Sequence, residues 1–368
     1  MKKIPMNPFE REPLAMKRGV RSAIRRVLKS GYFILGPEVE SFEREWTDYT
    51  GIAHTVGVGN GLDALELGMR ALGIGPGDEV VTTAMTAFAT VLAIHRVGAT
   101  PVIADIDEDT ALLSLASVES CLTAKTKAVI FVHLYGRAGD LSAFAELCAK
   151  NSLHLIEDCA QAHGARVNGQ HVGSFGIFGA FSFYPTKNLG AVGDGGALVT
   201  RNAEIARQVK ILRNYGQQNR YEHVLWGGNS RLDEIQAAIL RQKLKWLPLM
   251  NTNRVRNHEL LRSESGKLPE QTFLAPARKP DEHVGHLLVI RVSNRETVMQ
   301  RLTSAGIETL IHYPIPSHRQ APIVRALANP PQLVNAERHA ATCLTLPSSP
   351  WVKKTEIKRI AAELSRVL

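Results

Sequence analysis

The chain contains the stretch Phe178-Gly-Ala-Phe-Ser-Phe-Tyr-Pro-Thr-Lys187-Asn-Leu-Gly-Ala-Val-Gly-Asp-Gly-Gly196, in which one lysine lies among aromatic, hydroxyl-bearing and glycine residues. The stretch has too few charges to form a solvated face. A lysine in such surroundings loses the hydration of its ammonium form, which lowers its pKa and makes the neutral amine accessible near pH 7. A Schiff base requires such an amine. The plainer alternative is a lysine at a strand end that extends into solvent.

A second chemical group precedes this lysine in the sequence. The apolar run Leu153-His-Leu-Ile-Glu-Asp158 is typical of a buried strand that delivers a carboxylate to a pocket. Ser182 offers a hydroxyl to a phosphate group. A lysine paired with an acid that faces a pyridinium nitrogen is typical of enzymes that use pyridoxal phosphate (PLP). We therefore predict Lys187 and Asp158 as catalytic residues that also bind this cofactor or its amine form, pyridoxamine phosphate (PMP).

A glycine-rich turn is the candidate phosphate site. The segment Thr55-Val-Gly-Val-Gly-Asn-Gly-Leu-Asp63 predicts a strand that turns into a helix over 64–72. Free N–H groups at the start of such a helix bind phosphate, so the amides of Gly61 and Leu62 are the candidates. The turn also resembles part of a dinucleotide-binding motif. However, the next predicted strand, Glu79–Thr83, is not followed by the acid that would bind a ribose, which argues against NAD.

Composition limits the class of protein. With 368 residues, 44% of them hydrophobic, the chain can form a large core, divided here into a large and a small domain. The net charge of +9 is compatible with acidic small ligands or with nucleic acid. Basic residues cluster over 17–26, but apolar residues alternate with them at helical spacing. This pattern favours an amphipathic surface helix over a nucleic-acid-binding segment.

The cysteines and the N-terminal residues indicate the compartment. The four cysteines lie far apart and form no C-x-x-C pair, as expected for free thiols in a reducing cytoplasm: Cys121, Cys148, Cys159 and Cys343. The N-terminal lysines precede no apolar segment, and no apolar stretch is long enough to cross a membrane. We expect a soluble cytoplasmic protein without a membrane partner or a metal site.

Strands and helices alternate along the first two thirds of the chain. Strands are predicted over 101–105, 127–133 and 153–158, separated by amphipathic helices. This order predicts an α/β fold with a largely parallel sheet covered on both faces. Pro248 is the expected boundary between a large domain, 1–248, and a small α+β domain, 249–368. The small domain is expected to contain strands over 286–292 and 308–312.

Three separated motifs carry a resemblance to a known family. They are Glu157-Asp-Cys-Ala-Gln-Ala-His-Gly164, Ser182-Phe-Tyr-Pro-Thr-Lys-Asn-Leu-Gly190 and Gly193-Asp-Gly-Gly196. Their order and spacing resemble those of the DegT/DnrJ/EryC1/StrS family of PLP-dependent sugar aminotransferases. The resemblance implies fold type I, like aspartate aminotransferase, with a mostly parallel seven-stranded sheet. It also implies a homodimer with shared active sites.

The resemblance assigns roles to further residues. Phe88 would stack on the PLP ring, although an ordinary core phenylalanine is the alternative. Gln161 would hydrogen-bond the phenolic oxygen of the cofactor, and Asn229 would reach the PLP phosphate of the neighbouring subunit. Arg220 would bind the diphosphate of a sugar nucleotide, because a guanidinium matches phosphate geometry. The remaining residues expected near the substrate are Tyr184, Tyr221, His312 and Tyr313.

The resemblance also implies a reaction. An amino group would pass from glutamate to a nucleotide-linked keto sugar, and the motif around Lys187 most resembles enzymes that aminate C3 of dTDP-3-keto-6-deoxyhexoses. Such products enter O-antigens, surface glycans or antibiotics. Amination at C4 is the alternative, as are a UDP- or GDP-linked substrate. A sugar 3-dehydratase would carry histidine in place of Lys187. A sugar-responsive regulator and a nucleic-acid-binding protein are the alternatives from other classes.

Overall fold

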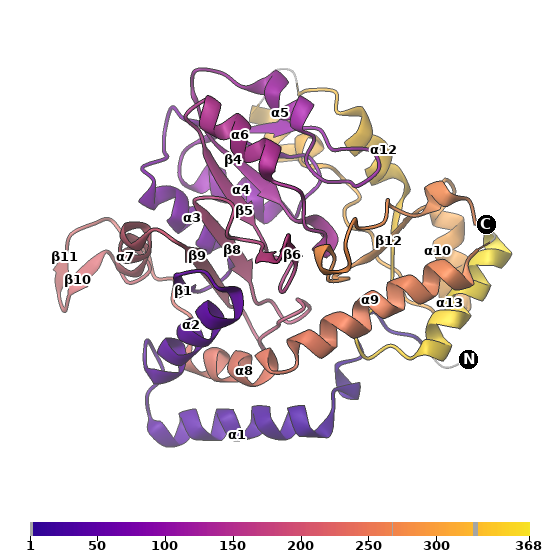
Figure 1. Cartoon of the computed structure of the whole chain (residues 1–368), viewed down its shortest axis with the longest axis horizontal. Helices are drawn as coiled ribbons and strands as arrows, with labels where there is room; N and C mark the ends of the chain where they lie inside the picture. Colours follow the sequence, from indigo (N-terminus) through magenta and orange to yellow (C-terminus); the bar gives the residue numbers. More distant parts are fainter. Residues whose placement is uncertain (1–2, 267, 327–329) are drawn as a thin grey trace.

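The computed structural model describes residues 3–266, 268–326 and 330–368, and a seven-stranded sheet forms its centre (Figure 1). The strand order is β1-β9-β8-β5-β4-β2-β3. Neighbouring strands from β3 to β8 run parallel, whereas β9 pairs antiparallel with both β8 and β1. The predicted α/β fold with a mostly parallel seven-stranded sheet is therefore confirmed. The strands are β1 (His54–Val58), β2 (Glu79–Thr83), β3 (Thr100–Ala104), β4 (Thr126–Val132), β5 (His154–Asp158), β8 (Phe178–Ser182) and β9 (Gly196–Thr200).

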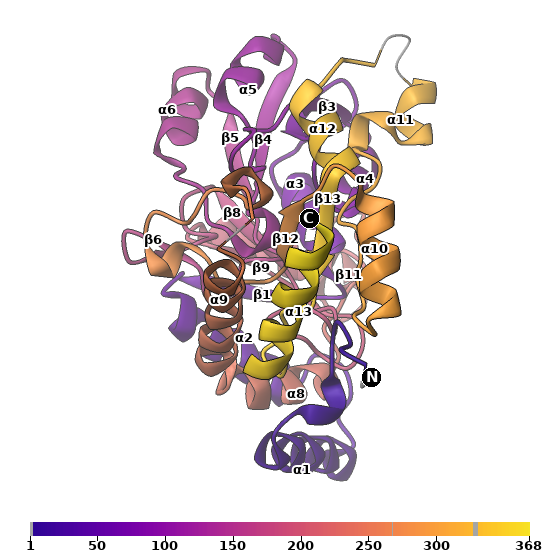
Figure 2. The ribbon, with the colours of Figure 1, turned by 90° about the vertical axis from the view of Figure 1, so that its right-hand side faces the viewer.

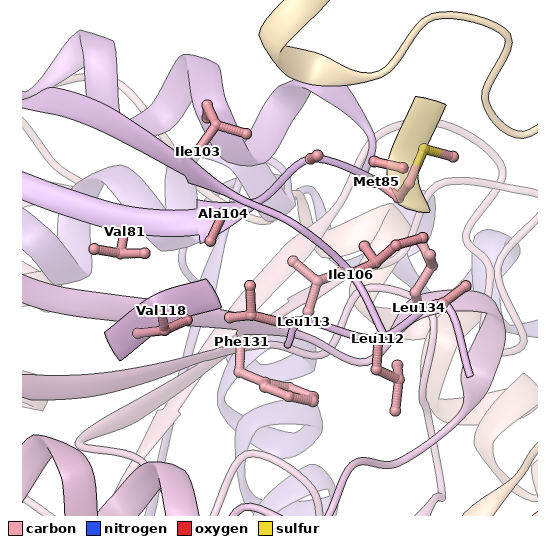
Figure 3. Close-up of a cluster of buried hydrophobic side chains, with 14 of the residues drawn as sticks. Val81, Met85, Ile103, Ala104, Ile106, Leu112, Leu113, Val118, Phe131 and Leu134 are labelled. Carbon is pink, nitrogen blue, oxygen red and sulfur yellow. The ribbon is translucent and has the colours of Figure 1, made fainter. Parts of the chain in front are cut away.

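Helices cover both faces of this sheet because its strands are apolar on both sides. Val80 and Ile130 pack in a cluster with α3, α4 and α7. The adjacent residues Val81 and Phe131 point to the opposite face, toward α5 and α6 (Figure 3). On that second face α2 and α8 cover the β8–β9 end. The helices are α2 (Pro37–Thr50), α3 (Gly61–Ala71), α4 (Phe88–Arg96), α5 (Leu115–Cys121), α6 (Ser142–Lys150), α7 (Ala203–Leu212) and α8 (Glu234–Leu244).

The basic N-terminal segment forms the predicted amphipathic helix. Helix α1 (Leu14–Ser30) lies against α8 at the edge of the molecule (Figure 1). It buries Met16, Ala23 and Val27, so the apolar residues between its basic side chains form its packed face. Within the described residues no helix is both long and apolar enough to cross a membrane.

The C-terminal third builds a second core around a two-stranded sheet (Figure 2). Ile4 from the N-terminal segment packs in this core and pairs with Ile307. Pro248 lies in the first turn of α9, which begins three residues after α8 ends, and the division at 248/249 stays a prediction. The elements of this part are α9 (Leu247–Glu264), β12 (Leu288–Arg291), α10 (Arg295–Ser304), α11 (Ala321–Ala326), α12 (Val334–Thr342), β13 (Cys343–Leu346) and α13 (Lys354–Val367).

The prediction of a strand over 308–312 is wrong. Residues 308–312 pair with β13 only at Leu310, through two hydrogen bonds with Thr345, and form no strand. The carbonyl of His312 accepts a hydrogen bond from Tyr135, and its ring bonds Thr345 Oγ1 at 2.8 Å. These contacts hold the segment beside Tyr135, which follows β4 of the large sheet, and the strand that pairs with β12 is β13, which was not predicted.

The remaining short elements lie in connections. Hairpins are formed by β6 (Arg166–Val167) with β7 (Gln170–His171), and by β10 (Gln217–Asn219) with β11 (Glu222–His223). The β10–β11 hairpin projects from the body of the molecule beside α7 (Figure 1). Short 3-10 helices occur at Phe9–Arg11, Leu134–Gly136, Glu270–Thr272, Pro280–Glu282 and Ser317–Arg319.

Candidate active site

Lys187 lies in the loop that joins β8 to β9, at the end of the sheet where β5 also ends. The loop begins with a turn in which the Lys187 amide donates to the carbonyl of Tyr184 at 2.9 Å. Burial lowers the pKa of the Lys187 amine to about 8, and the attraction of Asp158 partly opposes this shift. The neutral amine is therefore present in quantity near neutral pH, as a Schiff-base lysine requires.

Asp158 is the last residue of β5 and is only 7% exposed. One carboxylate oxygen accepts from Thr90 Oγ1 at 2.7 Å, and the other accepts from the amide of Ala160 at 3.1 Å. Thr90 belongs to α4 and is itself bonded to Thr86 Oγ1 at 2.8 Å. Hydrogen bonds from two sides fix the orientation of this carboxylate.

The residues of the predicted phosphate site lie where the start of α3 packs against the end of β8. Asn60 caps α3 by accepting from the amide of Asp63 at 2.9 Å. In the described part of the chain no acceptor is found for the amides of Gly61 and Leu62. A Cβ atom at position 61 would lie 2.7 Å from Cβ of Ser182. Only glycine therefore allows α3 to pack this closely against β8, which brings its free amides near Ser182.

A cavity of about 250 Å³ opens beside Lys187. It is lined by four of the other predicted residues: Gln161, Tyr184, His312 and Tyr313. Gln161 accepts from the amide of Tyr135 at 2.6 Å and donates to the Tyr313 hydroxyl at 3.1 Å. Burial raises the pKa of Tyr313 to about 12 and lowers that of His312 to about 4, so both side chains are neutral near pH 7.

The structure places the other predicted residues at different distances from this centre. Phe88 is the first residue of α4, two residues before Thr90, and is partly buried against the core. Arg220 and Tyr221 lie on the β10–β11 hairpin, and Tyr221 is 79% exposed. Neither residue lines the cavity beside Lys187 of its own chain. Asn229 is exposed and pairs with Asn214 through its backbone.

The segment that carries Asn229 nevertheless contacts the phosphate site. Ser230 Oγ accepts from the amide of Gly59 at 2.9 Å and donates to Asp63 at 2.7 Å. Asn229 thus lies next to a residue that contacts the predicted phosphate site of its own chain.

Sequence reasoning missed four residues of this region. Thr90 and Tyr135 hold Asp158 and Gln161 in place, and Arg254 and His286 line the cavity. Thr90 could have been found, because it occurs one helical turn after Thr86 next to the predicted stacking residue Phe88. Arg254 and His286 lie far along the chain, and no local pattern relates them to Lys187.

A buried group near β5 has the composition of a metal site but a structural explanation. The ligand atoms of His133, Glu157 and Cys159 lie within 4.8 Å of one another. The Glu157 carboxylate already accepts from His133 Nε2 at 3.0 Å and from three backbone amides: those of Gly173, Phe175 and Gly176. His133 Nδ1 accepts from the amide of Gly139 at 3.3 Å. These bonds give His133 a structural role in ordering the loop after β4.

Comparison with known proteins identifies the family. Residues 15–365 match the DegT/DnrJ/EryC1/StrS aminotransferase family. The chain belongs to this family. The predicted resemblance is therefore confirmed, and the chain is a sugar aminotransferase of the DegT/DnrJ/EryC1/StrS family with the type I fold.

Individual members of the DegT/DnrJ/EryC1/StrS family match over nearly the whole chain. The dTDP-3-amino-3,4,6-trideoxy-α-D-glucose transaminase of Streptomyces venezuelae is 43% identical over 92% of this chain and 89% of its own. The UDP-N-acetyl-3-dehydro-α-D-glucosamine 3-aminotransferase of Acidithiobacillus ferrooxidans is 42% identical over 99% and 98%. The crystal structure of NtdA from Bacillus subtilis with bound cofactor PMP is 30% identical and has a TM-score of 0.93. The match covers 100% of this chain and 85% of the NtdA chain.

The residues present fit the cofactor of the DegT/DnrJ/EryC1/StrS family. PLP supplies an aldehyde and a ring that withdraws electrons from a bonded amine. The unpaired amides of Gly61 and Leu62 and the Ser182 hydroxyl match a phosphate, the Asp158 carboxylate matches a pyridinium nitrogen, and the Lys187 amine matches the aldehyde. The cofactor prediction, PLP or PMP, is thus supported by the family and by the donor set.

Proposed function

We propose that this aminotransferase moves an amino group from glutamate to C3 of a dTDP-3-keto-6-deoxyhexose. The observation that carries the chemistry is a lysine of lowered pKa, about 8, beside a carboxylate fixed by two hydrogen bonds. The choice of C3 is supported by the resemblance of the Lys187 motif and by relatives whose names specify a 3-amino product or a 3-amination. The choice of dTDP rests on the resemblance of the Lys187 motif and on the Streptomyces venezuelae relative, whereas the Acidithiobacillus ferrooxidans relative is named for a UDP-linked sugar.

Each residue has a defined task in this proposal. With PLP bound, the Lys187 amine would hold the cofactor aldehyde and would later serve as the base that takes a proton from the substrate carbon. The Asp158 carboxylate would face the pyridine nitrogen and keep it protonated, so that the ring can withdraw electrons. Gln161 would donate to the phenolic oxygen, and Phe88 would pack against the ring. Tyr184, His312 and Tyr313, which border the cavity, contact the sugar.

The β10–β11 hairpin supports a homodimer with shared sites. Arg220, Tyr221 and Asn229 do not line the cavity beside Lys187 of their own chain, and the hairpin projects into solvent with Trp226 95% exposed next to it. Large aromatic side chains in such positions are typical of protein interfaces. We infer that Asn229 contacts the cofactor phosphate of the partner and that Arg220 and Tyr221 bind the nucleotide there.

The thiols support the expected compartment. All four cysteines are free: Cys121, Cys148, Cys159 and Cys343. Unpaired thiols are typical of a reducing compartment, so we place the enzyme in the cytoplasm.

The proposed function is tested with the purified protein, glutamate and a panel of 3-keto and 4-keto nucleotide sugars. The amino sugar is identified by mass spectrometry and NMR. We expect a 3-amino product from the dTDP-linked 3-keto sugar. A 4-amino product would refute the position of amination, and a preference for UDP-linked sugars would refute the nucleotide. No turnover of any sugar, with the cofactor bound, would favour the regulator.

A further inference from the structure

The cavity beside Lys187 is positively charged. Among the described residues that line it, Lys187 and Arg254 are cationic, and none is an aspartate or a glutamate. A cavity bordered by charges of one sign concentrates ligands of the opposite sign. The cavity therefore suits an anionic group close to the reactive amine.

Arg254 is a buried cation without a counter-ion. Its side chain is 6% exposed, and no carboxylate of the described residues forms a salt bridge with it. Nη1 donates to the carbonyl of His286 at 3.2 Å, whereas Nε has no hydrogen-bond partner in the part of the chain that is described. Burial lowers the pKa of Arg254 to about 10, which leaves the guanidinium charged at pH 7. A buried unpaired charge is costly, and a bound anion would offset that cost.

The surroundings of Arg254 hold it in place. One turn earlier on α9, Asn251 accepts from Asn188 at 2.8 Å, and Asn188 is the neighbour of Lys187. One turn later, Asn257 donates to the carbonyl of Ser349, another residue of the cavity wall, at 3.1 Å. These two bonds fix the face of α9 that carries Arg254, so its guanidinium is positioned before any ligand binds.

We propose that Arg254 binds the α-carboxylate of the amino-acid donor. The inference rests on the proposed function, because the donor must bring its nitrogen to the position occupied by Lys187 Nζ. The α-carboxylate is attached to the same carbon as that nitrogen and must therefore enter the same cavity. A guanidinium binds a carboxylate through two parallel hydrogen bonds, which orients the donor as well as holding it.

Separate measurements of the two half-reactions distinguish carboxylate binding by Arg254 from a purely structural role. The PLP form is mixed with L-glutamate, and the PMP form is mixed separately with the keto sugar, each followed by cofactor absorbance. Arg254→Gln is expected to lower kcat/KM for glutamate about 100-fold. It is expected to change kcat/KM for the keto sugar by less than about threefold. Arg256→Gln is the matched control on α9, because Arg256 does not line the cavity. Equal losses in both halves, or no loss, would overturn the proposal.

A binding measurement tests the same site without turnover. Glutarate, an unreactive dicarboxylate, is titrated into the holoenzyme by calorimetry. We expect the Kd to rise at least tenfold in Arg254→Gln and to stay unchanged in Arg256→Gln. If Arg254→Gln does not fold, Arg254→Lys is measured instead. Lysine keeps the positive charge but lacks the planar guanidinium, so glutarate binding should weaken about tenfold. Wild-type affinity in Arg254→Lys would overturn the proposal.

The two proposals can fail independently. A wild-type protein that binds glutarate through Arg254 but aminates no keto sugar would refute the proposed function and support the carboxylate site. A wild-type protein that runs both halves of the reaction, with glutarate binding unaffected by Arg254→Gln, would refute only the carboxylate site.

Discussion

The carboxylate of Asp158 accepts a hydrogen bond from Thr90 Oγ1 at 2.7 Å, which ties the end of β5 to the first turns of α4. The amide of Ala160 holds the other oxygen at 3.1 Å. The acid predicted to face the cofactor is therefore oriented by the start of α4, the helix that follows β2, in addition to its own strand.

Removal of the Thr90 hydroxyl should reduce activity without unfolding the protein. Hydrogen bonds to charged groups contribute about 1.5–3 kcal/mol. Thr90→Val keeps the shape of the side chain but removes one hydrogen-bond donor to Asp158, so kcat should fall about tenfold or more. Thr82→Val is the control, because Thr82 is equally buried and bonds only a backbone carbonyl of β4. Equal kcat losses in the two variants would contradict a specific role for Thr90.

A methyl group at position 61 should displace the start of α3 from Ser182 and so disrupt the predicted phosphate site. Its Cβ would lie 2.7 Å from Cβ of Ser182, closer than carbon atoms approach without a shift. We expect Gly61→Ala to weaken cofactor binding strongly, measured by equilibrium dialysis of PLP against the cofactor-free protein. Gly75→Ala is the control, since a Cβ there makes an ordinary contact at 3.6 Å. Unchanged PLP affinity in Gly61→Ala would place the phosphate elsewhere.

The reactivity of Lys187 should follow its lowered pKa. Burial lowers this pKa to about 8, so the neutral fraction of the amine grows as the pH rises from 7 to 9 and then levels off. Amine acylation of the cofactor-free protein, followed at Lys187 by peptide mass spectrometry, should show a midpoint near pH 8. In Asp158→Asn the midpoint should move lower, because the carboxylate that favours the charged amine is gone. A midpoint near pH 10 would show that Lys187 is solvated.

Mixed dimers test the shared sites. Lys187→Ala lacks the reactive amine, whereas Arg220→Ala lacks the group proposed to serve the partner's site. If sites are shared, a mixed dimer has one intact site, and an equal mixture should regain about a quarter of wild-type activity. The measurement is turnover after unfolding and refolding the two variants together. No gain over the separate variants would show that each site is built from one chain.

The sequence predicts the parts of the site that lie in local motifs. Asp158 ends a strand whose apolar run is visible in the sequence, Lys187 lies in a motif of aromatic residues and glycines, and Gly61 lies in a glycine-rich helix start. The strands β1 to β5 of the large sheet follow from the alternation of strand and helix, whereas β8 and β9 were not predicted from that pattern. In each predicted element the short-range pattern and the tertiary structure favour the same conformation.

The parts that sequence reasoning missed depend on contacts between distant segments. Residues 308–312 have a strand-like composition, but contacts of His312 with Tyr135 and Thr345 direct them to the cavity. Arg254 lies within a polar-looking helix, and only the packing of α9 brings it beside Lys187. Tertiary packing decides such positions, and propensity does not reveal them.

The central claim is that the Lys187 nitrogen bonds the cofactor aldehyde. Borohydride reduction of the holoenzyme makes such a bond permanent, and digestion followed by mass spectrometry locates it. We predict that the reduced cofactor is found on the peptide that contains Lys187 and that Lys187→Ala, reconstituted with PLP, carries no label. A label on a different lysine, or unlabelled Lys187 in fully active enzyme, would contradict the account.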